Sequence, residues 1–204
     1  MRRTKEEAAA TRKSLLQAAL QVFSRKGYAA TTLEDIASEA GVTRGAIYWH
    51  FGSKAELYNT LVAEMSRRLE QALADVTADG GSPLELLRRQ LVRSLEFMEE
   101  DEEARAVQEL VLFKTAVTPE LEAGIEAKRL GMKRWIDATA ASIEEAIRAG
   151  EVRRGVDPRD AAIAALGLQN GVFMTWLMAP ETFSLKARAA EIVDLFIQGI
   201  AARR

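Results

Sequence analysis

Helical periodicity runs through almost the whole of this chain and decides its fold class. Apolar residues recur three and four positions apart, and no run of Val, Ile, Thr and aromatic residues alternates with period two. Proline occurs only 4 times in 204 residues, so few positions interrupt a helix. The pattern predicts an all-α protein of about nine helices without a sheet.

Capping residues and glycines set the expected ends of these helices. Thr4 and Glu7 form a capping box for the first helix, and Ser82 with Pro83 is typical of a helix start. The expected helices run from Thr4 to Gly27, Thr32 to Gly41, Thr43 to about His50, Ser53 past Leu69, Ser82 to about Glu100, about Glu103 to Val117, and Thr118 to Ala149, with two more beginning at Asp157 and Ser184.

Composition and charge exclude several kinds of site. The chain has no cysteine and one histidine, so disulfides, thiolate chemistry and two-histidine metal sites are excluded, and we expect no metal and no cofactor. The net charge is −2, but it is unevenly distributed. Residues 1–68 carry 11 Lys and Arg against 7 acidic residues, a net of +4, whereas residues 69–204 carry 17 against 23, a net of −6. A polyanion-binding surface is therefore expected in the first third of the chain.

Two features invite an enzymatic or metal-binding interpretation. The acidic run 99–103 offers carboxylates, but consecutive charges at a helix boundary are more typical of a solvated helix start. His50 has no serine nucleophile motif beside it, and no convergent acid–base set stands out elsewhere. An all-α enzyme, or a binding module that uses no polyanion-binding surface, is therefore one functional class that stays open.

The most informative segment is Leu33 to Phe51. Two short helices are joined by Ala40-Gly41-Val42-Thr43, with a glycine where the chain must turn sharply, which is typical of a helix-turn-helix. The second helix begins with small residues, which allows close approach to base edges. Ile47 and Phe51 are expected to face the core, which leaves Arg44, Tyr48 and His50 available to DNA.

The longer string Ala37-x-x-Ala40-Gly41-Val42-Thr43-Arg44-Gly45-Ala46-Ile47-Tyr48-Trp49-His50-Phe51-x-x-Lys54-x-x-Leu57 is far more specific. It closely resembles the DNA-binding domain of the tetracycline-repressor (TetR) family, and within it the AcrR branch that represses multidrug efflux pumps. The resemblance in motifs covers residues 1 to about 65. It implies a helix-turn-helix domain at 1–65, a ligand-binding and dimerisation domain at 66–204, and a homodimer that a small molecule releases from operator DNA.

Site residues follow from the resemblance position by position. Places in the recognition helix that contact bases or phosphates correspond to Thr43, Arg44, Gly45, Tyr48 and His50. Two roles stay open for Trp49, which either packs within the protein or contacts a sugar of the DNA. Thr32 and Lys54 correspond to phosphate clamps at helix starts.

Bulky apolar residues with a few amides in the second part of the chain are typical of a pocket for a drug-like ligand. The set is Phe97, Gln108, Phe113, Met132, Trp135, Asn170, Phe173 and Met174. The expected partner is a small, largely apolar or aromatic effector. A regulator of a metabolic operon, answering a fatty acid, an acyl thioester or a pathway intermediate, is the alternative within the regulator class.

Residues 161–179 are almost wholly apolar and close to the length of a membrane span, but Gln169 and Asn170 lie at their middle. Residues 1–7 also lack the apolar stretch of a signal peptide, so a cytoplasmic protein without a membrane partner is expected. A helix that is apolar nearly all round needs cover on two sides, and a second copy of the chain can supply it. The expected dimer interface contains Gly167, Gly171, Trp176, Ile192 and Phe196.

Overall fold

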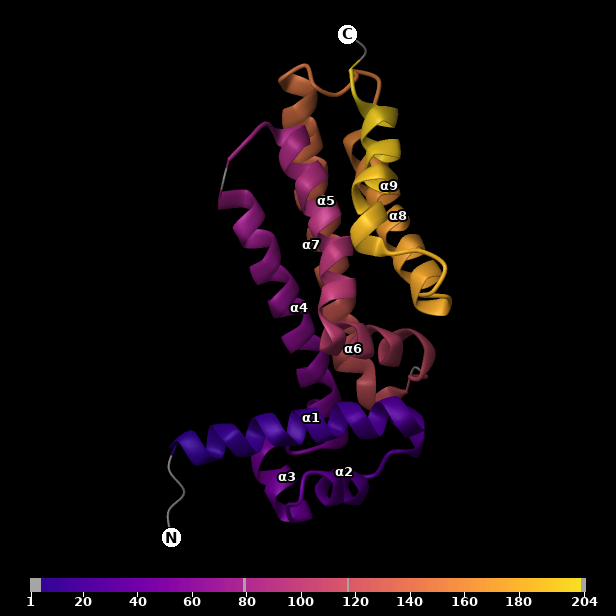
Figure 1. The fold of residues 1–204 in the computed structure, drawn as a ribbon. Coiled ribbons are helices and arrows are strands. Elements are labelled where there is room, and N and C mark those ends of the chain that lie inside the picture. The colour runs from indigo at the N-terminus through magenta and orange to yellow at the C-terminus, as the bar shows by residue number, and fades with distance from the viewer. Residues whose placement is uncertain (1–4, 79, 117, 203–204) are drawn as a thin grey trace. The chain divides into compact units, whose positions relative to one another are not determined.

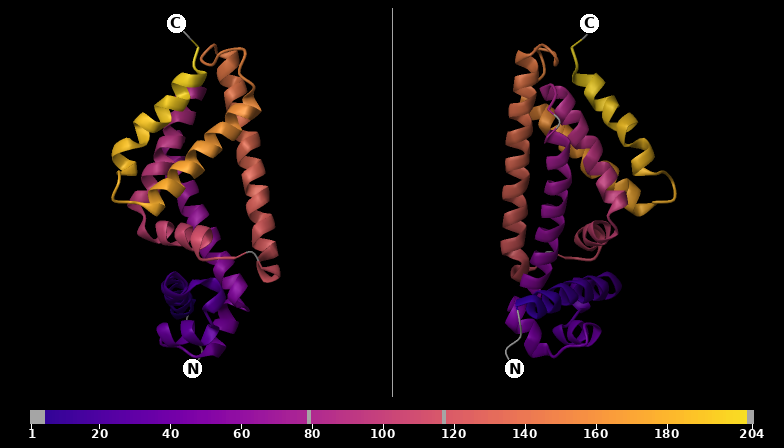
Figure 2. Two further views of the ribbon diagram at one scale, coloured as in Figure 1. Left: turned by 90° about the vertical axis from the view of Figure 1, so that its right-hand side faces the viewer. Right: turned by 60° about the vertical axis from the view of Figure 1, so that its left-hand side comes forward.

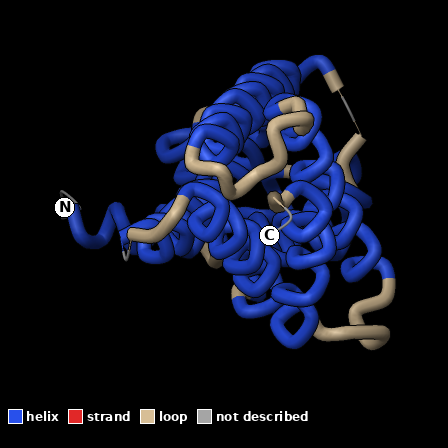
Figure 3. The backbone as a smooth tube through the Cα atoms, turned by 90° about the horizontal axis from the view of Figure 1, so that it is seen from above, coloured by secondary structure: helices blue, strands red, loops and turns tan. Residues whose placement is uncertain are grey.

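The computed structural model describes residues 5–78, 80–116 and 118–202, and helices dominate them (Figure 1). Within these ranges there are nine α-helices and one 3₁₀ turn: α1 Lys5–Ala30, α2 Leu33–Glu39, α3 Arg44–Phe51, α4 Lys54–Ala78, α5 Pro83–Glu100, α6 Glu102–Phe113, η1 Pro119–Leu121, α7 Glu122–Arg148, α8 Pro158–Met178 and α9 Leu185–Ile200. Figure 3 shows helices joined by loops along the described chain, and an isolated antiparallel bridge pairs Val152 with Ala201. The prediction of an all-α fold of about nine helices is confirmed.

Side-chain caps begin several of the helices where the sequence predicts them. Thr32 and Asp35 form a reciprocal capping box at α2, and the hydroxyl of Ser82 accepts from the backbone N–H of Glu85 at α5. Asp157 caps α8 and Ser184 caps α9 in the same way. Thr43 has the extended backbone of an N-cap at α3 but makes no side-chain cap bond. The capping box expected at Thr4 falls outside the described residues.

Two helix ends differ from the prediction. The chain kinks at Gly27, where φ is +76° and ψ is 166°, and helix geometry then resumes as far as Ala30 instead of ending at the glycine. α6 ends at Phe113, earlier than the predicted limit at Val117, which is itself outside the described residues. Both differences lie at helix ends, where local sequence signals are weakest.

The described chain divides into two compact units. The first runs to Arg67 and also includes Glu103–Ile125, and the second consists of Arg68–Glu102 and the chain from Glu126 onward. The first unit thus adds residues 103–125 to the segment in which the sequence motifs lie. The domain boundary at residue 65 stays a prediction.

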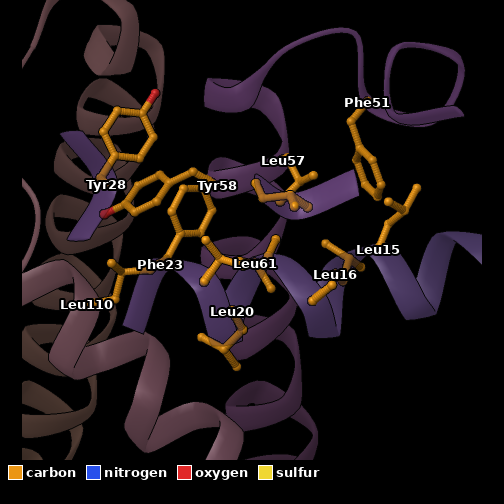
Figure 4. Packing of buried hydrophobic residues seen from close by; sticks show 14 of the residues in the cluster. Leu15, Leu16, Leu20, Phe23, Tyr28, Phe51, Leu57, Tyr58, Leu61 and Leu110 are labelled. Atoms are coloured by element: carbon orange, nitrogen blue, oxygen red, sulfur yellow. The ribbon is translucent and has the colours of Figure 1, made fainter. Parts of the chain in front are cut away.

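The first unit is built around one hydrophobic core. Residues from α1, α2, α3, α4 and α6 fill it, and Figure 4 shows the aromatic part, where Phe23, Tyr28 and Tyr58 meet. The rings of Phe23 and Tyr28 are stacked with centroids 5.6 Å apart, and Tyr58 meets Tyr28 edge-on at 5.1 Å. Burial raises the pKa of both tyrosines above the ordinary value.

The second unit has its own core, in which α5 packs against α9 and α8 (Figure 2). Arg88 of α5 holds Asp194 of α9 with two hydrogen bonds, of 2.5 Å and 2.8 Å, and this guanidinium lowers the pKa of the Asp194 carboxyl. Inside the core the amide of Gln169 donates to the hydroxyl of Ser94, so this buried polar pair is satisfied.

The acidic run 99–103 is only partly the solvated helix start that the sequence predicts: Glu102 and Glu103 are exposed at the start of α6, whereas Glu99 and Glu100 have structural partners. Glu99 accepts from the hydroxyl of Ser184 and the backbone N–H of Lys186 at the start of α9. Glu100 lies 2.8 Å from the Lys186 ammonium and 2.7 Å from the Arg93 guanidinium, and both cations lower its pKa. These carboxylates connect the end of α5 to the start of α9, and no group of three or more potential ligands among the described residues is placed to hold a metal ion.

α8 is long and apolar enough, by length and composition, to cross a membrane. It nevertheless packs one side into the second core, where Ala162, Ala165, Phe173 and Trp176 are buried. Core helices of ordinary globular proteins can be equally long and apolar. This packing supports the interpretation of α8 as such a helix.

Candidate DNA-binding site

The site begins with a sharp turn between α2 and α3. Gly41 adopts a φ of +65°, a conformation that favours glycine, and the backbone N–H of Val42 then donates to the carbonyl of Ala37 at 3.0 Å. Ile47 and Phe51 are 0% and 1% exposed and fix α3 to the first core. The prediction that these two side chains face inward is confirmed.

Ion pairs fix α2 against α1. The guanidinium of Arg25 lies 2.5 Å from Glu39, and the ammonium of Lys26 lies 2.7 Å from Asp35. The hydrogen bond from Lys26, together with those from Thr32, lowers the pKa of Asp35 to about 2. Because these groups are exposed, their main effect is to orient the short helix, and they add little to stability.

The opposite side of α3 presents cationic and aromatic groups to the exterior. Arg44 donates to the Tyr48 hydroxyl at 2.8 Å, its guanidinium lies 5.4 Å from the centre of that ring, and the hydrogen bond raises the pKa of Arg44. Tyr48 is 46% exposed and Trp49 71% exposed, which is unusual for side chains of this size. Thr43 and Gly45 are also exposed at the start of the helix. We call this surface of Thr43, Arg44, Gly45, Tyr48 and Trp49 the outer face of α3.

The other predicted DNA contacts are half-buried or hydrogen-bonded within the chain. His50 is half-buried, and its ring meets Trp49 edge-on with centroids 4.4 Å apart. The hydroxyl of Thr32 is engaged in the cap of α2. The ammonium of Lys54 donates to the backbone carbonyls of Tyr28 and Thr31. The assignment of these three residues and of the outer face of α3 to DNA contacts stays a prediction.

Arg12 of α1 is a further candidate for a DNA contact, and the sequence does not indicate it. Its guanidinium carbon lies 5.1 Å from the centre of the Phe51 ring, which places an exposed cation next to the end of α3. Arg12 is distant from α3 in the sequence, and its helix carries no DNA-binding motif. No sequence signal could have found it.

The predicted pocket residues differ widely in how far their side chains are buried. Phe97 and Phe173 are buried, Gln108 and Trp135 are half-buried, and Phe113, Met132, Asn170 and Met174 are exposed. Gln108 and Phe113 belong to the first unit and the other six to the second. A hollow of about 360 Å³ in the second unit is lined by other residues, from α7 and the start of α8. The pocket assignment stays a prediction.

The predicted interface residues also differ in their exposure. Gly167 and Gly171 are exposed, with nothing within 4 Å of the position that a Cβ would take. Ile192 and Phe196 are half-buried. Trp176 is only 2% exposed and packs in the core of its own unit, so its side chain offers almost no area to a partner.

Comparison with known families decides what this arrangement is. Residues 15–61 match "Bacterial regulatory proteins, tetR family", and residues 82–201 match "MAATS-type transcriptional repressor, C-terminal region". The chain belongs to the TetR family. This TetR-family protein is therefore a transcriptional regulator of a non-enzymatic family that binds operator DNA through its N-terminal helix-turn-helix, and the predicted resemblance to AcrR is confirmed.

Relatives and solved structures extend the similarity along the chain. AcrR of Shigella flexneri is 33% identical over 97% of this chain and 92% of the relative, and TtgR of Pseudomonas putida is 32% identical over 95% and 93%. NalD, the secondary repressor of the MexAB-OprM multidrug efflux pump in Pseudomonas aeruginosa, has a TM-score of 0.86 at 28% identity, covering 97% and 98%. SmeT of Stenotrophomonas maltophilia, in its triclosan complex, has a TM-score of 0.80 at 31% identity, covering 94% and 92%. This TetR-family protein is a MAATS-type repressor related to multidrug efflux pump repressors.

Proposed function

We propose that this protein is a cytoplasmic homodimer that represses an efflux or detoxification operon and leaves its operator when a small, largely apolar or aromatic compound binds. The observation that carries the proposal is the two-sided character of α3. Ile47 and Phe51 anchor the helix in the core, while Arg44, Tyr48 and Trp49 face outward. A helix held in this way can enter a major groove without losing its own packing.

The outer face of α3 supplies the chemistry that DNA binding needs. Arg44 offers guanidinium donors to base edges or phosphates, and Tyr48 offers a hydroxyl to a phosphate. Gly45 carries no side chain, so the backbone can approach the groove closely. Arg12, beside the end of α3, adds a cation on the same unit.

Operator binding should be specific and strongly dependent on salt. Each phosphate contact releases counterions, so we expect affinity for a pseudo-palindromic site to fall at least tenfold between about 50 and 200 mM salt. Fluorescence anisotropy measures this with duplexes from the region upstream of the protein's own gene and with duplexes selected from a random pool. Equal affinity for selected and scrambled duplexes at every salt concentration would contradict the proposal.

Substitutions on the outer face should weaken DNA binding without unfolding the protein. We expect Arg44→Ala and Tyr48→Ala each to cost on the order of 1 kcal/mol per protomer, applied twice in a dimer. Both side chains are exposed, so thermal unfolding should remain near that of the wild type. Lys13→Ala, which removes an exposed cation of α1, is the matched control, and normal operator binding by both outer-face variants would refute the docking face.

Dimerisation is supported by apolar side chains that the chain leaves uncovered. Ile163, Met174 and Met178 of α8 are 49%, 45% and 72% exposed, and Leu195 of α9 is 75% exposed. Gly167 and Gly171 fall on the same side of α8 as Ile163 and Met174, because these positions recur at helical spacing. Two such helices from each of two chains form a four-helix interface with twofold symmetry.

The effector class rests on the relatives. SmeT, whose fold matches this chain at a TM-score of 0.80, is described in a complex with triclosan, and NalD represses a multidrug efflux pump. We therefore propose that the second unit takes small aromatic compounds of this kind. Bulky apolar side chains with few polar groups are suited to holding such ligands.

A further inference from the structure

Lys54 is the first residue of α4, and its side chain turns back into the first unit. The ammonium donates to the backbone carbonyl of Tyr28 at 3.1 Å and to that of Thr31 at 3.0 Å. It also lies 4.3 Å from the centre of the Tyr28 ring. Two of its three donors and one cation–π contact are thus used within the chain.

The groups that hold Lys54 are themselves rigidly placed. Tyr28 is 1% exposed and lies in the aromatic cluster with Phe23 and Tyr58 (Figure 4). The backbone N–H of Tyr28 donates to the carbonyl of Lys114 at 3.0 Å, which fixes the end of α1 from the other side. Lys54 therefore bonds to an anchored surface of the core, and turning its ammonium toward a ligand would break two charge-assisted hydrogen bonds.

The position of this contact in the chain gives it a particular consequence. Thr31 directly precedes Thr32, the N-cap of α2, and Lys54 follows closely on Phe51, the last residue of α3. The bond between Lys54 and Thr31 joins residues 23 positions apart, and the whole helix-turn-helix lies between them. One ammonium thus links the two ends of the segment that contains α2 and α3.

We infer that Lys54 is a positioning residue, whose ammonium holds both ends of the helix-turn-helix at one point and acts on DNA through the placement of α3 rather than by touching a phosphate. The inference rests on the proposed DNA binding for its functional consequence. Its structural part concerns the free protein and can be tested without DNA.

The first test is hydrogen exchange of the free protein. Lys54→Met keeps a long apolar stem beside Tyr28 but removes the charge and the donors. We expect the amides of α2 and α3 to exchange at least tenfold faster, because closing bonds at the base of a segment protect it from local opening. Lys13→Met is the matched control, and peptides from α5 and α9 in the second unit report any global loss of stability. Unchanged exchange in α2 and α3 would overturn the inference, and so would equal acceleration everywhere.

The second test uses the salt dependence of operator binding. A lost phosphate contact lowers the slope of log K against log salt by about 0.9, hence by about 1.8 for the two protomers of a dimer. For Lys54→Met we expect at least tenfold weaker binding with the wild-type slope, because misplaced recognition helices lose affinity at every salt concentration alike. A slope reduced by nearly two would show that Lys54 contacts a phosphate. Unchanged affinity would show that Lys54 has no role in DNA binding. If the wild type binds no selected duplex, the proposed function fails, whereas the exchange experiment still decides the role of Lys54.

Discussion

Gly171→Arg is expected to convert the dimer into a monomer and to weaken operator binding by about 100-fold or more. In the proposed interface the two copies of α8 approach closely at this glycine, so each new guanidinium would be buried without a partner, a severe penalty. A monomer then binds only one half-site at a time and loses the gain in affinity that comes from linking two binding modules.

The protomer itself should tolerate the change. Nothing lies within 4 Å of a Cβ built on Gly171, and replacing a helical glycine removes a conformational cost of about 1 kcal/mol. Gly131→Arg in α7 is the matched control, because that glycine is also helical with nothing within 4 Å of its Cβ position. Analytical ultracentrifugation should show a monomer for the first variant and a dimer for the second. An intact dimer of the Gly171 variant would place the interface elsewhere.

Local signals account for most of what the sequence could predict. The cap at Thr32, the positive φ at Gly41 and the inward positions of Ile47 and Phe51 all follow from residues within a few positions of each other. Helix caps, turns and amphipathic faces depend on such short-range chemistry, so the sequence alone locates the helix-turn-helix.

Contacts between distant segments account for what the sequence does not indicate. The phosphate contact of Lys54 stays a prediction, and only the fold brings Tyr28 and Thr31 to its ammonium. Trp176 belongs to an apolar stripe that could face a partner or a core, and periodicity alone does not distinguish the two sides. The inclusion of residues 103–125 in the first unit likewise depends on long-range packing, such as the bond between Tyr28 and Lys114.

If an effector releases the protein from DNA, as proposed above, this packing offers its signal a route to the DNA-binding helices. The carbonyl of Lys114, just beyond α6, accepts from Tyr28, and its ammonium donates to the carbonyl of Ser24 at 2.9 Å. A Cβ on Gly27 would lie 3.2 Å from the same Lys114 carbonyl, so the two backbones are in close contact. A shift of the segment after α6 therefore moves the end of α1, to which Lys54 is bonded. The long helix α4, which contributes residues to both units, is a second route.

We therefore expect an effector that binds the protein to weaken operator binding about 100-fold, which requires about 2.7 kcal/mol of preference for the form that does not bind DNA. By linkage, saturating operator must weaken effector binding by the same factor. Calorimetric titration of small aromatic compounds, with and without operator, measures both sides of this relation. Compounds that bind equally well in the presence of operator would exclude release by an effector.

Lys114→Met tests the side-chain part of the first route. It removes the bond from the Lys114 ammonium to the carbonyl of Ser24 but keeps the backbone bond from Tyr28 to the Lys114 carbonyl. If the ammonium carries the signal, the variant should bind operator and effector separately with near wild-type affinity, while the factor by which each ligand weakens binding of the other should fall toward one. A coupling factor that stays near 100 would exclude the ammonium and leave the backbone contact and α4 to carry the signal.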